Sequence, residues 1–195
     1  MSGKCRQIAS GALYKSSTDP VTGETVRWQR EWFDIHDAKL DALADLVDEL
    51  QGTQLLVAYE YEHDLVRLQK RFPGTPYLGS GVSTKEAARI EREWNSGKLR
   101  LLFGHPASMG HGLNFQHSHA HHVAWFTTTW SFEQYEQFNA RLRRRGNQSA
   151  HLFVYHLVAR RTIEDGVVIP GLRAKEKGQR ALFDALKAYA AARKA

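Results

Sequence analysis

The amino-acid sequence predicts an α/β protein: a three-layer αβα sandwich built around a mostly parallel sheet. Short apolar runs of strand length, such as "QLLVAY" (54–59) and "HVAWF" (122–126), contain few polar residues. Such runs are typical of strands that are buried on both faces of a sheet. Amphipathic helical segments separate the runs, and parallel strands require crossover connections of that kind. With 195 residues, the chain is long enough for one good-sized domain with its own core.

The individual elements follow from periodicity and from residues that begin or end helices. Apolar residues between 37 and 52 recur on one helical stripe, and Gly52 ends that helix. Ser83, followed three residues later by Glu86, is a capping-box pattern that begins another helix. The predicted strands are 54–59, 75–78, 99–104, 122–126 and 151–157. The predicted helices are 37–52, 62–74, 83–95, 131–145 and the region after Ile163, with an interruption at Pro170–Gly171.

Three regions are predicted along the chain. Residues 1–34 show weak periodicity, and their segment 16–25 is rich in the residues of exposed turns, so we interpret 1–34 as a connector. Residues 35–169 contain all the alternating strands and helices and form the main lobe. Residues 170–195 are a basic, helical C-terminal extension.

The net charge of +6 is concentrated in that extension. Between Arg173 and Lys194 there are seven Lys or Arg against Glu176 and Asp184, which accounts for five of the six positive charges. Two interpretations are compatible with this pattern. One is a solvated terminal helix with a basic face, which is common and which the charge by itself favours. The other is a surface that attracts a polyanion such as DNA.

Several classes of protein are excluded or disfavoured by composition. No apolar run approaches the length of a membrane span, and the N-terminus lacks the apolar core of a signal peptide, so no membrane partner is expected. Cys5 is the single cysteine and cannot form an internal disulfide, which fits a reducing cytoplasm.

Two loops after predicted strands contain the candidate functional residues, because ligands of parallel α/β sheets gather at the carboxyl ends of the strands. In the second loop, 127–148, a helix would place Gln137, Arg141 and Arg144 on one stripe. This stripe lies away from the apolar stripe that contains Phe138. Arginine suits phosphate because it offers paired, rigid donors. The alternative is a basic helix end that complements the helix dipole.

The first loop, 105–116, contains two glycines that flank a histidine. Gly110 and Gly112 stand on either side of His111, and Asn114 follows. Glycines let backbone N–H groups approach a phosphate closely, although an ordinary tight turn explains the same pattern.

Four histidines between His117 and His122 raise the question of a zinc site. Their spacing matches no closed four-ligand site, and Cys5 is remote in the sequence. We interpret the segment as a polar loop that leads into a strand, and we predict no metal ligand in this chain.

Taken together, these segments resemble the second RecA-like lobe of superfamily 2 helicases of the Swi/Snf type, especially the DEAD/DEAH-related members encoded by bacteriophages. The resemblance covers nearly the whole chain, from about Lys4 to Tyr189. Its specificity comes from the order and spacing of the blocks. The blocks are "IHDAKLDALADLVDEL" and "QLLVAYEYEHDLVRL" for the first helix and motif IV, "SMGHGLNFQHSHAHHVAWF" for motif V, "TWSFEQYEQFNARLRRRGNQ" for motif VI, and "VYHLVARRTIED" for the closing strand.

The resemblance implies an ATP-driven motor whose second lobe closes over the nucleotide. Arg141 and Arg144 match the two motif VI arginines, which would meet the charge that builds up on the γ-phosphate during hydrolysis. The resemblance also implies contacts to ATP and to nucleic acid. The residues expected near ATP are Gly110, Gly112, Asn114 and Gln137, and those expected near DNA are Ser80, Gly81, Ser108, His111 and Trp130.

The chain contains no G-x-x-x-x-G-K-[ST] phosphate loop and no DEAH-like acidic box. By the resemblance, these belong to a first RecA-like lobe, which would bind ATP and hold its Mg²⁺. We therefore expect DNA and a first lobe as partners, an isolated chain without ATPase activity, and a bacterial cytoplasm as the setting of a phage protein. The alternative hypothesis is a nucleic-acid-binding module, or an inactive helicase fragment, without catalysis.

Overall fold

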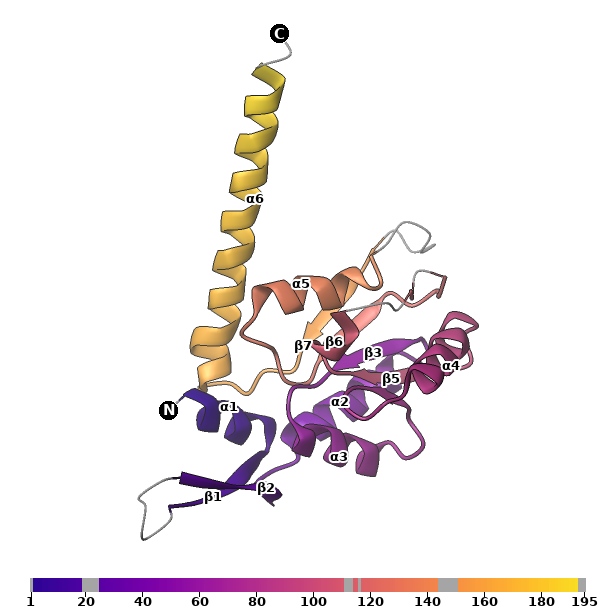
Figure 1. Ribbon diagram of the computed structural model, residues 1–195, viewed down its shortest axis with the longest axis vertical. Coiled ribbons are helices and arrows are strands. Elements are labelled where there is room, and N and C mark those ends of the chain that lie inside the picture. Colours follow the sequence, from indigo (N-terminus) through magenta and orange to yellow (C-terminus); the bar gives the residue numbers. More distant parts are fainter. Residues whose placement is uncertain (1, 19–24, 111–113, 116, 144–150, 193–195) are drawn as a thin grey trace.

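The computed structural model describes residues 2–18, 25–110, 114–115, 117–143 and 151–192 (Figure 1). Its centre is a five-stranded sheet in the order β4-β5-β3-β6-β7, in which every neighbouring pair is parallel. This confirms the predicted fold class. The strands are β3 (Leu55–Ala58), β4 (Tyr77–Leu78), β5 (Leu101–Gly104), β6 (His122–Trp125) and β7 (Phe153–His156).

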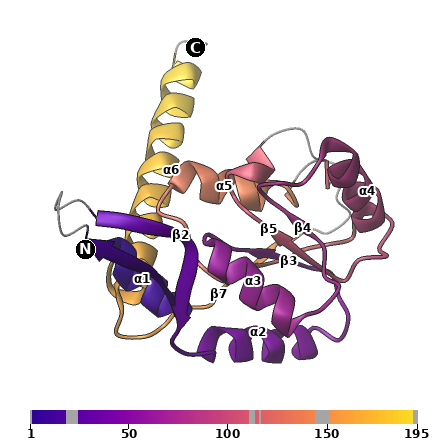
Figure 2. The same cartoon turned by 60° about the horizontal axis from the view of Figure 1, so that its bottom comes forward.

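Helices cover both faces of this sheet (Figures 1 and 2). Helices α2 (Ala38–Glu49) and α3 (Glu62–Arg71) pack on one face, and α4 (Thr84–Asn95) and α5 (Phe132–Ala140) pack on the other. Successive side chains of a strand point to opposite faces, so β3 contributes Leu55 and Val57 to one core and Leu56 and Ala58 to the other. All four are buried, which explains why this strand has no polar position.

The predicted capping box at the start of α4 is present in part. The Ser83 side chain accepts a hydrogen bond from the backbone N–H of Glu86 at 3.2 Å. This bond satisfies one of the backbone donors that the first turn of a helix leaves without a helical partner. The Glu86 carboxylate is instead paired with Arg89, at 2.6 Å.

The N-terminal segment forms a helix and a small sheet of its own. Helix α1 (Ser2–Ser10) leads into the antiparallel strands β1 (Ala12–Thr18) and β2 (Thr25–Asp34). Gly11, between α1 and β1, has φ +102°, and a Cβ atom there would overlap the carbonyl oxygen of His36. The turn predicted at 16–25 falls where the two strands are joined, and residues 19–24 lie outside the described part of the chain.

Arg67 of α3 ties this segment to the lobe. Its guanidinium, 5% exposed, donates to the carbonyl oxygen of Ser10 at 2.9 Å, to the carbonyl of His36 and to the carboxylate of Asp37 at 2.9 Å. One buried cation therefore joins the end of α1, the chain after β2 and the start of α2.

Helix α5 is shorter than the sequence predicts. The prediction extended it to residue 145, but it ends at Ala140 with Arg141 as its C-cap. The backbone N–H groups of Arg141 and Leu142 bond to carbonyls three residues back, those of Phe138 and Asn139, at 3.1 and 3.3 Å. This tighter turn ends the α-helical pattern and directs the buried Leu142 into the core.

The C-terminal helix is longer and more regular than the sequence predicts. A π-helical turn, η2 (Glu164–Val168), runs directly into α6 (Ile169–Ala192), and no break occurs at Pro170–Gly171. Pro170 is the second residue of α6, and a helix tolerates proline in its first turn. Figure 1 shows α6 extending well beyond the body of the lobe. Among the described residues, no helix has both the length and the apolar character that crossing a bilayer requires.

A buried ion pair links the two ends of the lobe. Lys39 Nζ lies 2.7 Å from Glu164 Oε1, and the two side chains are 4% and 2% exposed. Burial lowers the pKa of the Lys39 ammonium, and the Glu164 carboxylate opposes this effect. Lys39 also donates to the carbonyl oxygen of Phe126 at 2.8 Å, and Glu164 Oε2 accepts from the backbone N–H of Ala159.

We expect Lys39→Ala to lower the free energy of unfolding by about 3 kcal/mol, because it leaves the Glu164 carboxylate buried without its cation. Urea unfolding followed by circular dichroism measures this loss. Lys15→Ala is the matched control, since it removes one partner of the exposed pair Lys15–Glu31 and should cost less than about 1 kcal/mol. Equal losses in the two variants would contradict the structural role of the buried pair.

Candidate functional site

The carboxyl ends of the parallel strands meet at one edge of the sheet, and most of the predicted site residues lie along it. Ser80 and Gly81 follow β4, the 3-10 turn η1 (Ser108–Gly110) follows β5, and Trp130 follows β6. Because ligands of parallel α/β folds bind at this edge, the topology places these residues where a nucleotide or nucleic-acid site is expected.

The two loops that the sequence singles out are in contact. Met109 of η1 and Phe138 of α5 both pack against the same side of Gly104, at the end of β5. The Trp125 indole N–H of β6 donates to Asn139 Oδ1 at 3.1 Å and holds α5 against the sheet. The motif V-like loop and the motif VI-like helix therefore form one unit at the edge.

The predicted residues differ in their exposure. Ser80, Gly81, Ser108, Asn114 and Gln137 are exposed, and Trp130 is half-buried. The Asn114 carbonyl accepts from the side-chain amide of Asn95 at 2.7 Å, and the side-chain amide of Gln137 donates to Glu133 at 3.0 Å. Gly110 lies in η1. His111, Gly112 and Arg144 lie outside the described residues.

Arg141 is buried, at 4% exposed. The sequence places it on the same stripe as Gln137, which is exposed, so the two side chains do not share a solvent-facing surface in this structure. Arg141 is the C-cap of α5 and stands next to Leu142, which belongs to the core.

Beneath the edge lies a group of buried charged and polar side chains that sequence reasoning did not single out. They come from α1, α2, α3 and η2. The group consists of Arg6, Lys39, His63, Asp64, Arg67 and Glu164. Asp64 had a sequence signal, since an acidic residue at the third helical position can accept from the N-cap backbone N–H, as it does here from Tyr61 at 3.1 Å. His63 pairs with its sequence neighbour Asp64, and the partners of Arg6, Lys39, Arg67 and Glu164 include groups far away in the sequence.

Asp64 is the acidic centre of one part of this group. Burial alone would raise the pKa of its carboxyl, but His63 Nδ1, 3.1 Å from Asp64 Oδ1, and the backbone N–H of Tyr61 outweigh burial and lower the pKa. The His63 ring is itself completely buried and stacks on Tyr61, with ring centroids 4.9 Å apart, and beside Tyr14 at 4.8 Å. The strand β1 is thereby packed onto the start of α3.

Glu60 lies two residues after the end of β3, at the edge. Burial raises the pKa of its carboxyl, which the charges of Arg6 and His105 oppose. His105, after β5, has Nε2 3.2 Å from the Glu60 carbonyl oxygen. The ends of β3 and β5 are therefore joined by polar groups at the point where the sheet carries its loops.

The histidine segment packs against β7. His122 stacks on Phe153, with ring centroids 5.2 Å apart, and its Nδ1 lies 3.1 Å from the Tyr155 hydroxyl. His117 and His119 are exposed. Within the described ranges, no three His, Cys, Asp or Glu side chains gather in a way that could hold a metal ion.

We expect Gly104→Ala to lower the free energy of unfolding by about 1–3 kcal/mol, because its Cβ would overlap Met109 Sδ and lie 3.0 Å from Phe138 Cε2. Urea titration measures this change. The control is Gly178→Ala in α6, where a Cβ meets nothing within 4 Å and the free energy of unfolding should rise, by up to about 1 kcal/mol. Unchanged stability in the Gly104 variant would show that η1 and α5 are not tightly packed.

No family model matches this chain, and the known proteins that are similar to it include the following two. Protein p41 of Acyrthosiphon pisum secondary endosymbiont phage 1 is 39% identical over 188 residues, which cover 94% of this chain and 37% of p41. The crystal structure of the C-terminal part of the Fun30 ATPase domain matches 66% of this chain and 43% of its own length, with a TM-score of 0.56 and 16% identity.

The chain thus spans less than half the length of each of these two proteins. At 16% identity, the likeness to Fun30 concerns the fold alone. Together with the parallel five-stranded sheet and its two helical layers, it shows that this chain has a RecA-like α/β fold, as found in the C-terminal part of that ATPase domain.

Proposed function

We propose that this chain is the C-terminal motor lobe of an ATP-dependent DNA helicase or translocase, completed by a first RecA-like lobe. The observation that carries the proposal is the fold, which matches the C-terminal part of an ATPase domain. The order of the motif-like blocks supports it further, because the blocks that resemble motifs V and VI lie side by side at the carboxyl edge of the sheet.

In this proposal ATP binds with Mg²⁺ between the two lobes, and the first lobe holds the metal ion. Arg141 and Arg144 are the arginine fingers, which stabilise the charge that develops on the γ-phosphate. Gly110, Gly112, Asn114 and Gln137 line the nucleotide side of the cleft. Since Arg141 is buried in the isolated lobe, its guanidinium has to turn outward when the two lobes close.

The same edge would hold DNA through its backbone. Ser80 and Ser108 expose hydroxyl groups, and Gly81, with φ +84°, exposes its peptide groups without a side chain. Together with His111, such groups bind phosphates and position a strand without reading its sequence. The half-buried Trp130 offers a ring on which a base can stack. A phage relative makes the cytoplasm of a bacterial host the natural setting for this activity.

The test is ATP hydrolysis with and without a first lobe. We expect the pure chain to have no appreciable ATPase activity, and a mixture with a first lobe from a related helicase to hydrolyse ATP when DNA is added. In that mixture Arg141→Ala or Arg144→Ala should lower kcat by about a thousandfold or more, with a smaller effect on the KM for ATP.

Arg143→Ala is the matched control, because this neighbouring arginine is exposed and belongs to neither predicted finger. Its kcat should stay close to that of the wild type. A loss below about tenfold in the Arg141 and Arg144 variants would contradict the arginine-finger role, and turnover by the pure chain would contradict the division between two lobes.

A second candidate function is a nucleic-acid-binding module without catalysis. The exposed cations Arg173, Lys175 and Lys177 at the base of the projecting helix α6 favour it. It predicts that this chain alone binds DNA with an affinity that falls steeply as salt rises.

Fluorescence anisotropy with labelled DNA measures this binding, and a chain that lacks residues 173–194 is the comparison. Loss of binding on deletion would place the DNA surface on α6. Retained binding would place it on the lobe, as the motor proposal requires. No binding at low salt would exclude the module.

A further inference from the structure

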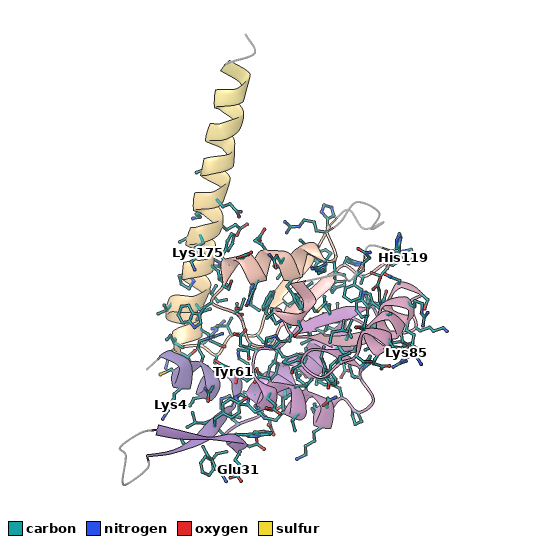
Figure 3. All side chains as sticks on the ribbon, in the orientation of Figure 1. Lys4, Glu31, Tyr61, Lys85, His119 and Lys175 are labelled. Carbon is teal, nitrogen blue, oxygen red and sulfur yellow. The ribbon has the colours of Figure 1, made fainter. Side chains whose placement is uncertain are left out.

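The segment that connects β6 to α5 is held by three cations from three different helices. Along this segment, residues 126–130, alternate carbonyl oxygens accept a hydrogen bond from a charged side chain. Lys39 of α2 bonds to Phe126 at 2.8 Å, Arg6 of α1 to Thr128 at 2.6 Å, and Lys175 of α6 to Trp130 at 3.3 Å. Figure 3 shows Lys175 on α6 beside the start of α5.

This segment needs such partners because it is buried and has left the sheet. Thr127, Thr128 and Thr129 are at most 2% exposed. The backbone N–H of Phe126 still bonds to Ala58 of β3, but the carbonyls beyond it have no neighbouring strand. A buried carbonyl without a partner is costly, and a charged donor makes a stronger bond than a neutral one.

The segment determines where α5 begins. The Thr129 hydroxyl donates to Gln134 Oε1 at 3.2 Å and accepts from the backbone N–H of Ser131 at 3.2 Å. Ser131 is the N-cap of α5, and its side chain accepts from the backbone N–H of Gln134. A shift of the segment would therefore move the first turn of α5 and, with it, the helix that leads to Arg141.

Arg6 differs from the two lysines in origin and in environment. It comes from the N-terminal segment, which the sequence suggests is only a connector, yet it is 5% exposed. Its guanidinium lies over the rings of Tyr61 and Trp130, with its carbon 5.8 and 5.5 Å from the two ring centroids. Arg6 therefore contacts both the backbone of the segment and the side chain of Trp130.

We propose that Arg6 is a positioning residue of the motor: it holds residues 126–131 so that Trp130 and α5 are placed for DNA and nucleotide. This rests on the proposed function. Arg6 touches neither ATP nor DNA itself and acts through Thr128 and Trp130. Arg67 bonds to the carbonyl oxygen of Ser10 and so fixes the end of α1 to the lobe, which keeps Arg6 next to the segment that it holds.

The first experiment is hydrogen exchange with mass spectrometry on the full chain. Arg6→Ala should speed amide exchange about tenfold or more in the peptides that cover 127–136, with little change in those that cover β3 and β5. Lys4→Ala is the matched control, since Lys4 is an exposed cation on the same helix, bonded only to Ser16 Oγ among the described contacts. It should leave exchange in 127–136 unchanged.

Arg6→Lys keeps the charge and a donor but loses the planar group over the two rings, so its exchange in 127–136 should lie between wild type and Arg6→Ala. If Arg6→Ala fails to fold, Arg6→Lys is the test variant, and its amides in 127–136 should exchange faster than those of the wild type. The proposal would be overturned if the amides of 127–136 exchanged at the wild-type rate in Arg6→Ala or, where Arg6→Ala does not fold, in Arg6→Lys.

The second experiment uses the mixture with a first lobe. Arg6→Ala should lower kcat and weaken DNA binding by about tenfold, with a KM for ATP close to wild type, and Arg6→Lys should restore part of both. An active mixture in which Arg6→Ala keeps wild-type kcat and DNA affinity overturns the role of Arg6 and leaves the motor proposal standing. A wild-type mixture without activity overturns the motor proposal, even where Arg6→Ala changes exchange.

Discussion

The contact on which the rest of the lobe depends is the buried pair Lys39–Glu164, together with the bond from Lys39 to the Phe126 carbonyl. It joins the start of α2, the end of β6 and the turn that begins α6. Taking either charge out of water costs several kcal/mol, and only the opposite charge at hydrogen-bond distance offsets that cost. The first and last elements of the lobe are therefore stable next to each other only when both are in place.

Several more buried charged side chains lie beneath the carboxyl edge of the sheet. Arg6, Arg67 and Asp64 are all buried; Arg6 and Arg67 bond to backbone carbonyls of other elements, and Asp64 accepts from the N-cap backbone of its own helix. Apolar side chains of similar size could stabilise the lobe as well, but they would not specify which carbonyl or N–H group they meet. Charged side chains that form hydrogen bonds do specify the backbone group that they meet. The edge thus combines exposed polar loops with a base of buried, hydrogen-bonded side chains.

Local patterns predicted most of the elements. The apolar stripe of 37–52 and the Ser83 cap act over one or two helical turns, and both α2 and α4 formed close to the predicted bounds. Predictions failed where distant contacts decide. Helix α5 ends at Ala140 and not near residue 145, and α6 continues without a break through Pro170–Gly171. Likewise, no sequence pattern near Arg6 predicts that its side chain bonds to the Thr128 carbonyl oxygen.

By itself, the sequence determined the αβα class, the strand and helix order of the main lobe and the two loops at which candidate residues gather, because periodicity and turn residues are local properties of the chain. Only the tertiary structure decided which loops touch, that Arg141 is buried while Gln137 is exposed, and that the N-terminal segment is anchored in the lobe. Those outcomes depend on contacts between residues that are distant in the sequence, which can be 125 positions apart as in Lys39–Glu164, and local sequence does not encode such pairings.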